Sequence, residues 1–172
     1  MLLGVLTVFA LGCKSKIDRA LELITPYEKY FMGSKVVLDS IPMGLESKLS
    51  AFSKEFKQYS KSPQYLFAAA YIAEKRGKIR EAADFSAMYV DEYPNEKKHR
   101  MESAMVAAHY FENMQKFDLA LKYYDILTKE FSTHEIGKQA KFTAEMIRKG
   151  AVTPERQLQM MLERASKDSV GK

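Results

Sequence analysis

Apolar residues recur at helical spacing along most of this chain, and the helical runs come in pairs joined by short turns. In the first clear pair, residues 64–76 and residues 79–93 each carry an apolar face. Gly77 lies between them, where a tight turn is favoured. Pro94 follows the second run, and helices usually end before the residue that precedes a proline. The pattern predicts two antiparallel helices.

The plan repeats 38 residues later. Residues 102–114 and 117–131 form the second predicted pair, and Gln115 stands at the turn where the first pair has glycine. Small residues keep the same spacing, as at Ala82 and Ala120. Because such side chains let two helix backbones approach closely, we expect them where the helices of a pair cross. The period indicates a stack of similar units.

Flanking segments are less regular. Residues 45–59 are predicted to be the second helix of an earlier unit, and residues 18–31 its first helix, broken or kinked at Pro26. Residues 33–44 are expected to be an irregular connection. After the second pair, residues 136–149 predict a further first helix.

The last segment favours a capping helix. Thr153, Pro154 and Glu155 are a typical helix start: a capping hydroxyl, a proline at the first helical position and an acid in the first turn. Leu158 and Leu162 then fall on one face. Such a helix is the polar end that a helical stack requires.

The first residues form an uncharged apolar run, residues 2–12, which ends at Cys13, the only cysteine. Eleven residues are too few for a transmembrane helix, which needs about 20. They suit the apolar part of a signal peptide. Ala10-Leu11-Gly12-Cys13 resembles a lipobox, the site at which bacterial lipoproteins are cleaved and lipidated, although Ala10 and Leu11 depart from its strict form. The resemblance implies acylation of Cys13.

The paired helices resemble tetratricopeptide (TPR) repeats. The residues that carry the resemblance are Gly77-Lys78-Ile79-Arg80-Glu81-Ala82 with Pro94, and Gln115-Lys116-Phe117-Asp118-Leu119-Ala120 with Tyr124. The longer period is similar to that of periplasmic TPR proteins of the BamD and CpoB type. The resemblance implies an all-α fold, a short right-handed superhelical stack of antiparallel helix pairs.

TPR arrays hold a peptide or partner segment on an inner face lined by the first helix of each pair. Carried over to this chain, the family's inner-face positions are Gln64, Phe67, Tyr71, Glu74, Glu102, Met105, His109 and Glu112. Phe67 and Met105 have the alternative of packing against a neighbouring helix.

Composition adds few constraints. The chain is 47% hydrophobic and has a net charge of +5, a mild excess without a basic run, so no nucleic-acid partner is expected. His99, His109 and His134 lack the spacing of a helical metal site. No catalytic residue, metal site or cofactor is predicted. Carboxylates such as Asp91 and Glu112 are expected on solvated helix faces.

These patterns predict a non-enzymatic, lipid-anchored TPR scaffold for envelope proteins at the bacterial outer membrane, facing the periplasm. The alternatives are a cell-wall enzyme or a subunit of one, and a soluble TPR adaptor without lipidation. The predicted regions are a signal peptide (1–12), a lipid-attachment site with an N-terminal helix and linker (13–44), helical repeats (45–150, clearest at 63–94 and 101–132), and a capping helix with a tail (151–172).

Overall fold

The computed structural model describes residues 14–33 and 36–150, together with Leu158 and Leu162. These residues are helical or irregular, and none of them forms a strand, which confirms the predicted all-α class. The described part divides into two compact units, one ending at Ile41 and the other beginning at Pro42. The predicted signal peptide and Cys13, and most of the predicted capping helix, lie outside the described residues. Leu158 and Leu162 are helical and exposed.

No helix among the described residues combines the length and apolar character that crossing a bilayer demands.

The first unit contains short helices. Helix α1 (Lys16–Glu22) begins with a capping box, in which the Ser15 and Asp18 side chains each bind the other residue's backbone N–H. A 3-10 turn (Thr25–Tyr27) and helix α2 (Glu28–Phe31) follow. The helix predicted over residues 18–31 is therefore interrupted, as Pro26 suggested. A second 3-10 turn, Leu38–Ser40, lies in the predicted irregular connection.

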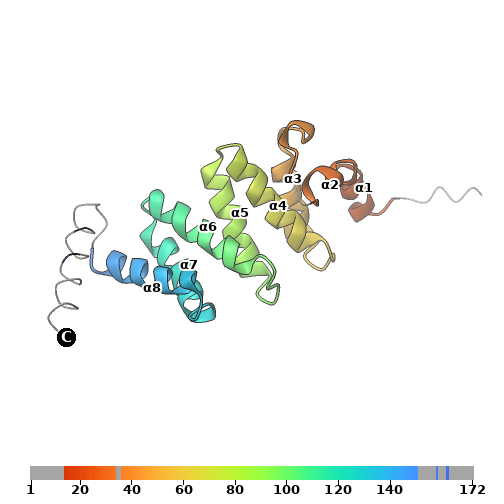
Figure 1. Ribbon diagram of the computed structural model, residues 1–172. Coiled ribbons are helices and arrows are strands. Elements are labelled where there is room, and N and C mark those ends of the chain that lie inside the picture. The colour runs from red at the N-terminus through yellow and green to blue at the C-terminus, as the bar shows by residue number, and fades with distance from the viewer. Residues whose placement is uncertain (1–13, 34–35, 151–157, 159–161, 163–172) are drawn as a thin grey trace, which may run out of the picture. The chain divides into compact units, whose positions relative to one another are not determined.

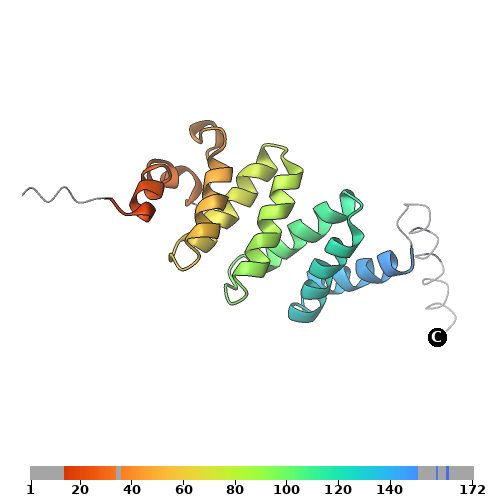
Figure 2. The ribbon, with the colours of Figure 1, turned by 180° about the vertical axis from the view of Figure 1, so that it is seen from behind.

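The second unit is a stack in which each helix packs against the next along the chain (Figure 1). The same order is seen from behind (Figure 2). Its helices are α3 (Leu45–Glu55), α4 (Ser62–Lys75), α5 (Ile79–Glu92), α6 (Arg100–Asn113), α7 (Phe117–Glu130) and α8 (Glu135–Arg148). The predicted starts of α3, α5 and α7 are correct, and those of α4, α6 and α8 are within two residues.

Small residues allow this close packing. Ala69, Ala82, Ala107, Ala108 and Ala120 are each fully buried, as expected for residues at helix crossings. Larger apolar side chains fill the space on either side.

The turn between α4 and α5 is a Schellman motif. The N–H of Lys78 donates to the carbonyl of Ala73 (2.9 Å), and the N–H of Gly77 donates to that of Glu74 (2.9 Å). Gly77 has a φ of 70°, in the left-handed region that glycine adopts without a steric penalty.

The turn between α6 and α7 has the same geometry without a glycine. The N–H of Lys116 donates to the carbonyl of Phe111 (2.8 Å), and that of Gln115 donates to Glu112 (2.8 Å). Gln115 has a φ of 58°, and it is the one non-glycine residue with positive φ in the described part of the chain. The two turns therefore repeat in backbone conformation as well as in sequence position.

Ion pairs tie successive helices together. Arg100, at the start of α6, donates from Nε and Nη2 to the two carboxylate oxygens of Glu130 on α7 (2.6 and 2.8 Å). Its Nη1 also donates to the carbonyl of Val90 on α5 (2.7 Å). A planar guanidinium suits this two-pronged contact. Arg100 thus joins three helices.

A second group of ion pairs has a fully buried carboxylate. Glu46 on α3 has no exposed surface, and it accepts hydrogen bonds from Arg76 Nη1 (2.6 Å) and Lys78 Nζ (2.7 Å). Burial alone would raise the pKa of Glu46, but the hydrogen bond from Lys78 and the charges of Lys78 and Arg76 outweigh it and lower the pKa. Glu46 therefore holds α3 to the α4–α5 turn as a carboxylate.

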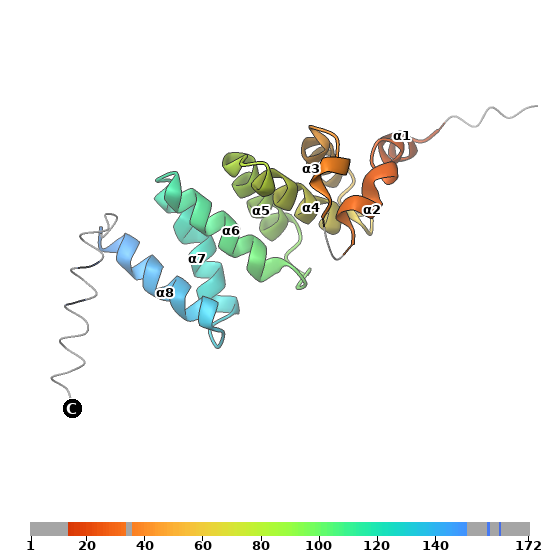
Figure 3. The same ribbon diagram turned by 45° about the horizontal axis from the view of Figure 1, so that its top comes forward.

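Helix α8 lies against the end of α7 through Gly137 (Figure 3). A Cβ at this position would overlap the backbone carbonyl of Phe131 and lie 3.0 Å from the carbonyl oxygen of Leu127. A residue without a side chain is thus required where the two backbones meet.

Candidate functional site

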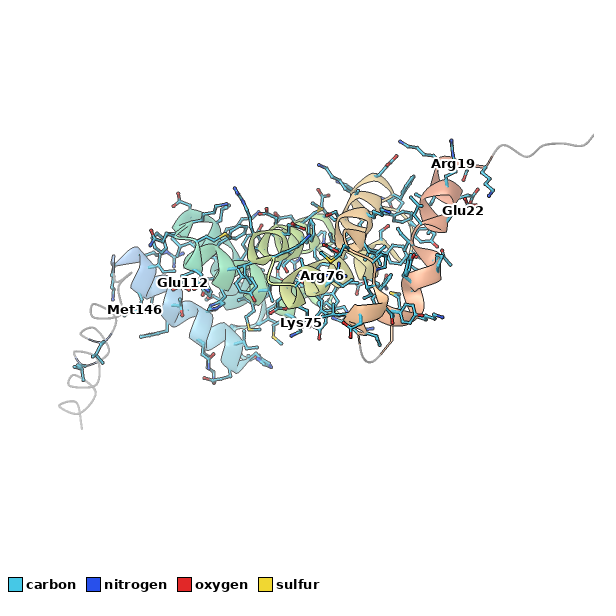
Figure 4. All side chains as sticks on the ribbon, turned by 90° about the horizontal axis from the view of Figure 1, so that it is seen from above. Arg19, Glu22, Lys75, Arg76, Glu112 and Met146 are labelled. Atoms are coloured by element: carbon cyan, nitrogen blue, oxygen red, sulfur yellow. The ribbon has the colours of Figure 1, made fainter. Side chains whose placement is uncertain are left out.

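A hollow of the second unit opens between α6 and α8, with Tyr124 of α7 as its floor. It has a volume of about 600 Å³ and includes His109, Glu112, Tyr124 and Met146 in its lining. An adjoining hollow of about 320 Å³ shares His109, Tyr124, Gln139 and Thr143 and extends toward Glu74 on α4. We call the two together the α6–α8 groove. Figure 4 labels Glu112 and Met146.

One carboxylate of the groove is held by a buried tyrosine. Tyr124 on α7 donates its hydroxyl to Glu112 Oε2 on α6 (2.5 Å) and is 8% exposed. Burial, followed by the hydrogen bond to Glu112 and the charge of that carboxylate, raises the pKa of Tyr124 well above its ordinary value. The phenol therefore stays protonated at neutral pH and serves as a donor rather than a base.

A second carboxylate is held in a similar way. Tyr110 on α6 donates its hydroxyl to Glu74 Oε1 on α4 (2.9 Å). Burial, and then the hydrogen bond to Glu74, raises the pKa of this tyrosine as well. Glu74 and Glu112 occupy equivalent places at the ends of α4 and α6. Each of the two repeated helix pairs, α4–α5 and α6–α7, therefore presents one carboxylate that a tyrosine binds.

The predicted inner-face residues divide into two groups. Glu74, Met105, His109 and Glu112 all line the α6–α8 groove. Met105 is 40% exposed, so its thioether is accessible there.

His109 is exposed on α6, where Asn113 Nδ2 lies 3.1 Å from its Nε2. Asn113 can donate to this nitrogen in the tautomer that leaves Nε2 without a proton, and the imidazole faces the groove as a polar group.

The other predicted residues lie outside this groove. Phe67, Tyr71 and Glu102 line a crevice of about 10 Å³ between α4, α5 and α6, which also reaches Glu74. The amide of Gln64, oriented to donate, reaches the carbonyls of Ser60 and Lys61 in the preceding turn.

Phe67 is mainly a packing residue. Its ring stacks on His99 at 3.7 Å between centroids, with 12° between the planes, and meets the edge of Tyr89 at 6.2 Å. Burial, followed by the charge of Lys98, lowers the pKa of His99. Phe67 therefore follows the alternative given for it above, in which its ring packs against a neighbouring helix.

The expectation of solvated carboxylates was wrong for Glu112, which is half-buried and bound by Tyr124. It holds in part for Asp91, which is exposed but accepts hydrogen bonds from Lys122 Nζ (2.7 Å) and the Tyr123 hydroxyl (2.9 Å). The sequence pattern indicates on which face of a helix these carboxylates lie. It does not indicate which tyrosine donates a hydrogen bond to each of them.

Sequence reasoning missed the second wall of the groove. Gln139, Thr143 and Met146 on α8 complete it, with Tyr124 as its floor. The sequence does predict a helix over residues 136–149, as the first helix of a further pair. Its inner-face positions could have indicated these three residues. The fixed period does not extend to it, because α6 and α8 start 35 residues apart rather than 38.

No group of three or more His, Cys, Asp or Glu residues within the described ranges is arranged to hold a metal ion. Several basic residues are committed to internal ion pairs: Arg76 to Glu46, Arg100 to Glu130 and Lys57 to Glu92. The groove itself offers hydrogen-bonding groups, carboxylates and apolar walls. This combination suits the binding of a partner molecule.

Comparison with protein-family models, with curated proteins and with solved structures gives no match for this chain. The arguments below therefore rest on its sequence and structure.

Proposed function

We propose that this chain is a non-enzymatic, lipid-anchored scaffold of the TPR type, which holds a partner protein in the α6–α8 groove. The place proposed for it is the periplasmic side of a bacterial outer membrane, among envelope-assembly or envelope-maintenance proteins. One observation carries the proposal: four of the residues carried over from the TPR inner face, Glu74, Met105, His109 and Glu112, line one open groove.

Repetition of backbone geometry supports the TPR assignment. Helices α4 and α6 start 38 residues apart, as do α5 and α7, and all four have 14 residues. Their turns share the Schellman hydrogen bonds and the left-handed residue at Gly77 and Gln115. A right-handed superhelix is the arrangement that TPR units adopt.

The composition of the groove supports binding rather than turnover. Its tyrosines, Tyr110 and Tyr124, are protonated donors with raised pKa values. They hold two of its carboxylates, Glu74 and Glu112, which come from separate helices. A peptide segment offers backbone groups and side chains for such a mixed surface.

The lipid anchor rests on the apolar run 2–12 and on Cys13, which lie outside the described residues. One acyl chain holds a protein only marginally, at about 0.8 kcal/mol per buried CH₂, so lipoproteins use two or three. Cells fed a labelled fatty acid should label the wild-type protein and leave Cys13→Ser unlabelled. Equal labelling of the two would contradict the anchor and favour a soluble adaptor.

The scaffold function is tested by site-specific photo-crosslinking in cells. A photoreactive phenylalanine analogue placed at His109 on one wall, or at Gln139 on the other, should crosslink to the same protein. The analogue at Arg80, an exposed position of α5 outside the groove, is the matched control and should give no such product.

Crosslinks of one protein from Arg80 as strong as those from the groove, or none from either wall, would refute the groove as the binding site. A purified chain that cleaves wall fragments by itself would instead favour the cell-wall enzyme.

A further inference from the structure

The charge of the groove differs in sign from that of the chain. The whole sequence has a net charge of +5. The groove is lined by three carboxylates, Glu74, Glu112 and Glu135, and by one ammonium, Lys138. Lys138 Nζ lies 3.8 Å from Glu135 Oε2, and both side chains are exposed. Glu74 and Glu112 are therefore left as the uncompensated charges of the groove.

Tyrosines fix these two carboxylates without neutralising them. Tyr110 binds Oε1 of Glu74 and Tyr124 binds Oε2 of Glu112. A phenol donates a hydrogen bond but carries no positive charge, so it does not offset the charge of a carboxylate. Among the described residues, no donor reaches the second oxygen of either carboxylate. Each thus presents an acceptor whose position is set before a ligand arrives, which lowers the entropy cost of binding.

Apolar surface flanks the charges. Met105 is partly exposed on α6, and Ile136 on α8 lines the same hollow as Glu74. Lysine and arginine match such a site, because their alkyl stems pack on apolar surface while the charged head reaches a carboxylate. An acidic segment would instead bring like charges together, which costs binding energy and slows association.

We propose that the α6–α8 groove selects a partner segment that presents lysine or arginine side chains to Glu74 and Glu112. This inference rests on the proposed function, since it takes the groove to be the partner site, and it adds the chemical class of the segment bound.

The test uses the full-length chain in detergent and three matched fluorescent peptides. In the first, lysine alternates with leucine, and in the other two glutamate or glutamine replaces the lysine. Fluorescence anisotropy should show binding of the lysine peptide, weakened by added salt, since exposed charges are screened beyond about 10 Å at 0.1 M. The other two peptides should bind at least about tenfold more weakly.

Two variants locate the effect. In Glu74→Gln and Glu112→Gln the side-chain carbonyl can still accept the tyrosine hydroxyl, so only the charge is removed. The double variant should raise the Kd for the lysine peptide by about tenfold or more. Asp84→Asn removes one charge from an exposed position of α5 outside the groove, and it should leave the Kd unchanged. Circular dichroism confirms that each variant is folded.

Absence of binding by the lysine peptide, equal binding by the glutamate peptide, or an unchanged Kd in the double variant would overturn the inference. The proposed function is read out separately by the crosslinks from His109 and Gln139. If the groove crosslinks to a partner but shows no preference for the lysine peptide, the proposed scaffold function stands and only the inferred preference for basic side chains is refuted.

Discussion

Gln115 and Gly77 occupy the same left-handed position in two equivalent turns. An L-residue with a Cβ pays about 1–2 kcal/mol for this conformation, whereas glycine does not. Gln115 therefore stores backbone strain that the repeated hydrogen bonds of the turn overcome.

Gln115→Gly should raise the free energy of unfolding by about 0.5–1 kcal/mol, because relief of strain exceeds the added entropy of the unfolded glycine. Gly77→Ala should lower it by about 1 kcal/mol. A Cβ at Gly77 meets nothing within 4 Å, so this cost is one of backbone conformation alone. Urea denaturation measures both. Shifts of the same sign in the two variants would contradict the strain argument.

Glu46 is a buried residue whose charge contributes to folding. Its pKa is lowered in the folded protein, so its ion pairs contribute stability above the ordinary carboxyl pKa of 4.5. That stability is lost as the pH falls through the lower pKa of the folded state. Glu130 behaves alike, because the hydrogen bond from Arg100 lowers its pKa.

The wild-type chain should therefore lose thermal stability as the pH falls below 4.5. Glu46→Gln should be destabilised at neutral pH by about 1–3 kcal/mol, because Arg76 and the partly exposed Lys78 lose a charged hydrogen-bond acceptor. It should then lose less than the wild type on acidification. Melting temperatures measured from neutral pH to below pH 4.5 test this prediction. If the melting temperature falls equally with pH in the two proteins, Glu46 is not the group that causes the loss of stability.

At the scale of the helix, Gly137 controls how α8 sits on α7. Gly137→Ala places a Cβ onto the Phe131 carbonyl, so the helices must separate or shift. We expect a loss of about 1–3 kcal/mol of stability, as for other overpacked positions. Because α8 forms one wall of the groove, peptide binding should weaken as well.

Gly33→Ala is the matched control, since a Cβ there lies 3.8 Å from the nearest atom, the carbonyl oxygen of Lys29. It should change the free energy of unfolding by less than about 0.5 kcal/mol. Equal effects of the two substitutions, in denaturation and in peptide binding, would mean that the α7–α8 contact does not require glycine.

Helices α4 to α7 were predictable from the sequence because apolar periodicity and a turn residue agree in each pair, and the first pair also has a closing proline, Pro94. The helix over residues 45–59 was overextended, since α3 ends at Glu55. Periodicity marks the buried face but not the point where backbone hydrogen bonding stops.

Half of the candidate site was predictable for a related reason. The resemblance to TPR repeats predicts Glu74, Met105, His109 and Glu112 on one face. The tyrosines that bind the carboxylates, and the buried pairing of Glu46, depend on distances between helices. Such contacts join residues more than ten positions apart, as in Tyr124 and Glu112, and no local pattern encodes them.

At the scale of the second unit, extensive packing joins each helix to the next one along the chain. Stability in such a stack is close to a sum of terms for single helices and for neighbouring pairs, and opening starts where neighbours are fewest. Helices α4 to α7 each have packed neighbours on both sides, and α5 and α6 are the middle pair between α3 and α8.

Hydrogen exchange should therefore be slowest in α5 and α6 and faster in α8, which packs on α7. Mass spectrometry of exchanged peptides measures this order. In Gly137→Ala, exchange in α8 should accelerate further, with α5 unaffected. Exchange at one common rate in all helices would show instead that the unit opens as a whole.

Packing between successive helices also leaves the length of the chain adjustable. A duplicated segment that starts at Ile79 and ends before Phe117 would supply one more turn of the Gln115 kind and one more helix pair, and the new pair would meet surfaces that resemble its present neighbours. Gene duplication could thus lengthen the binding surface without redesigning any interior. The number of units in a relative of this chain would then record how long a segment it has to hold.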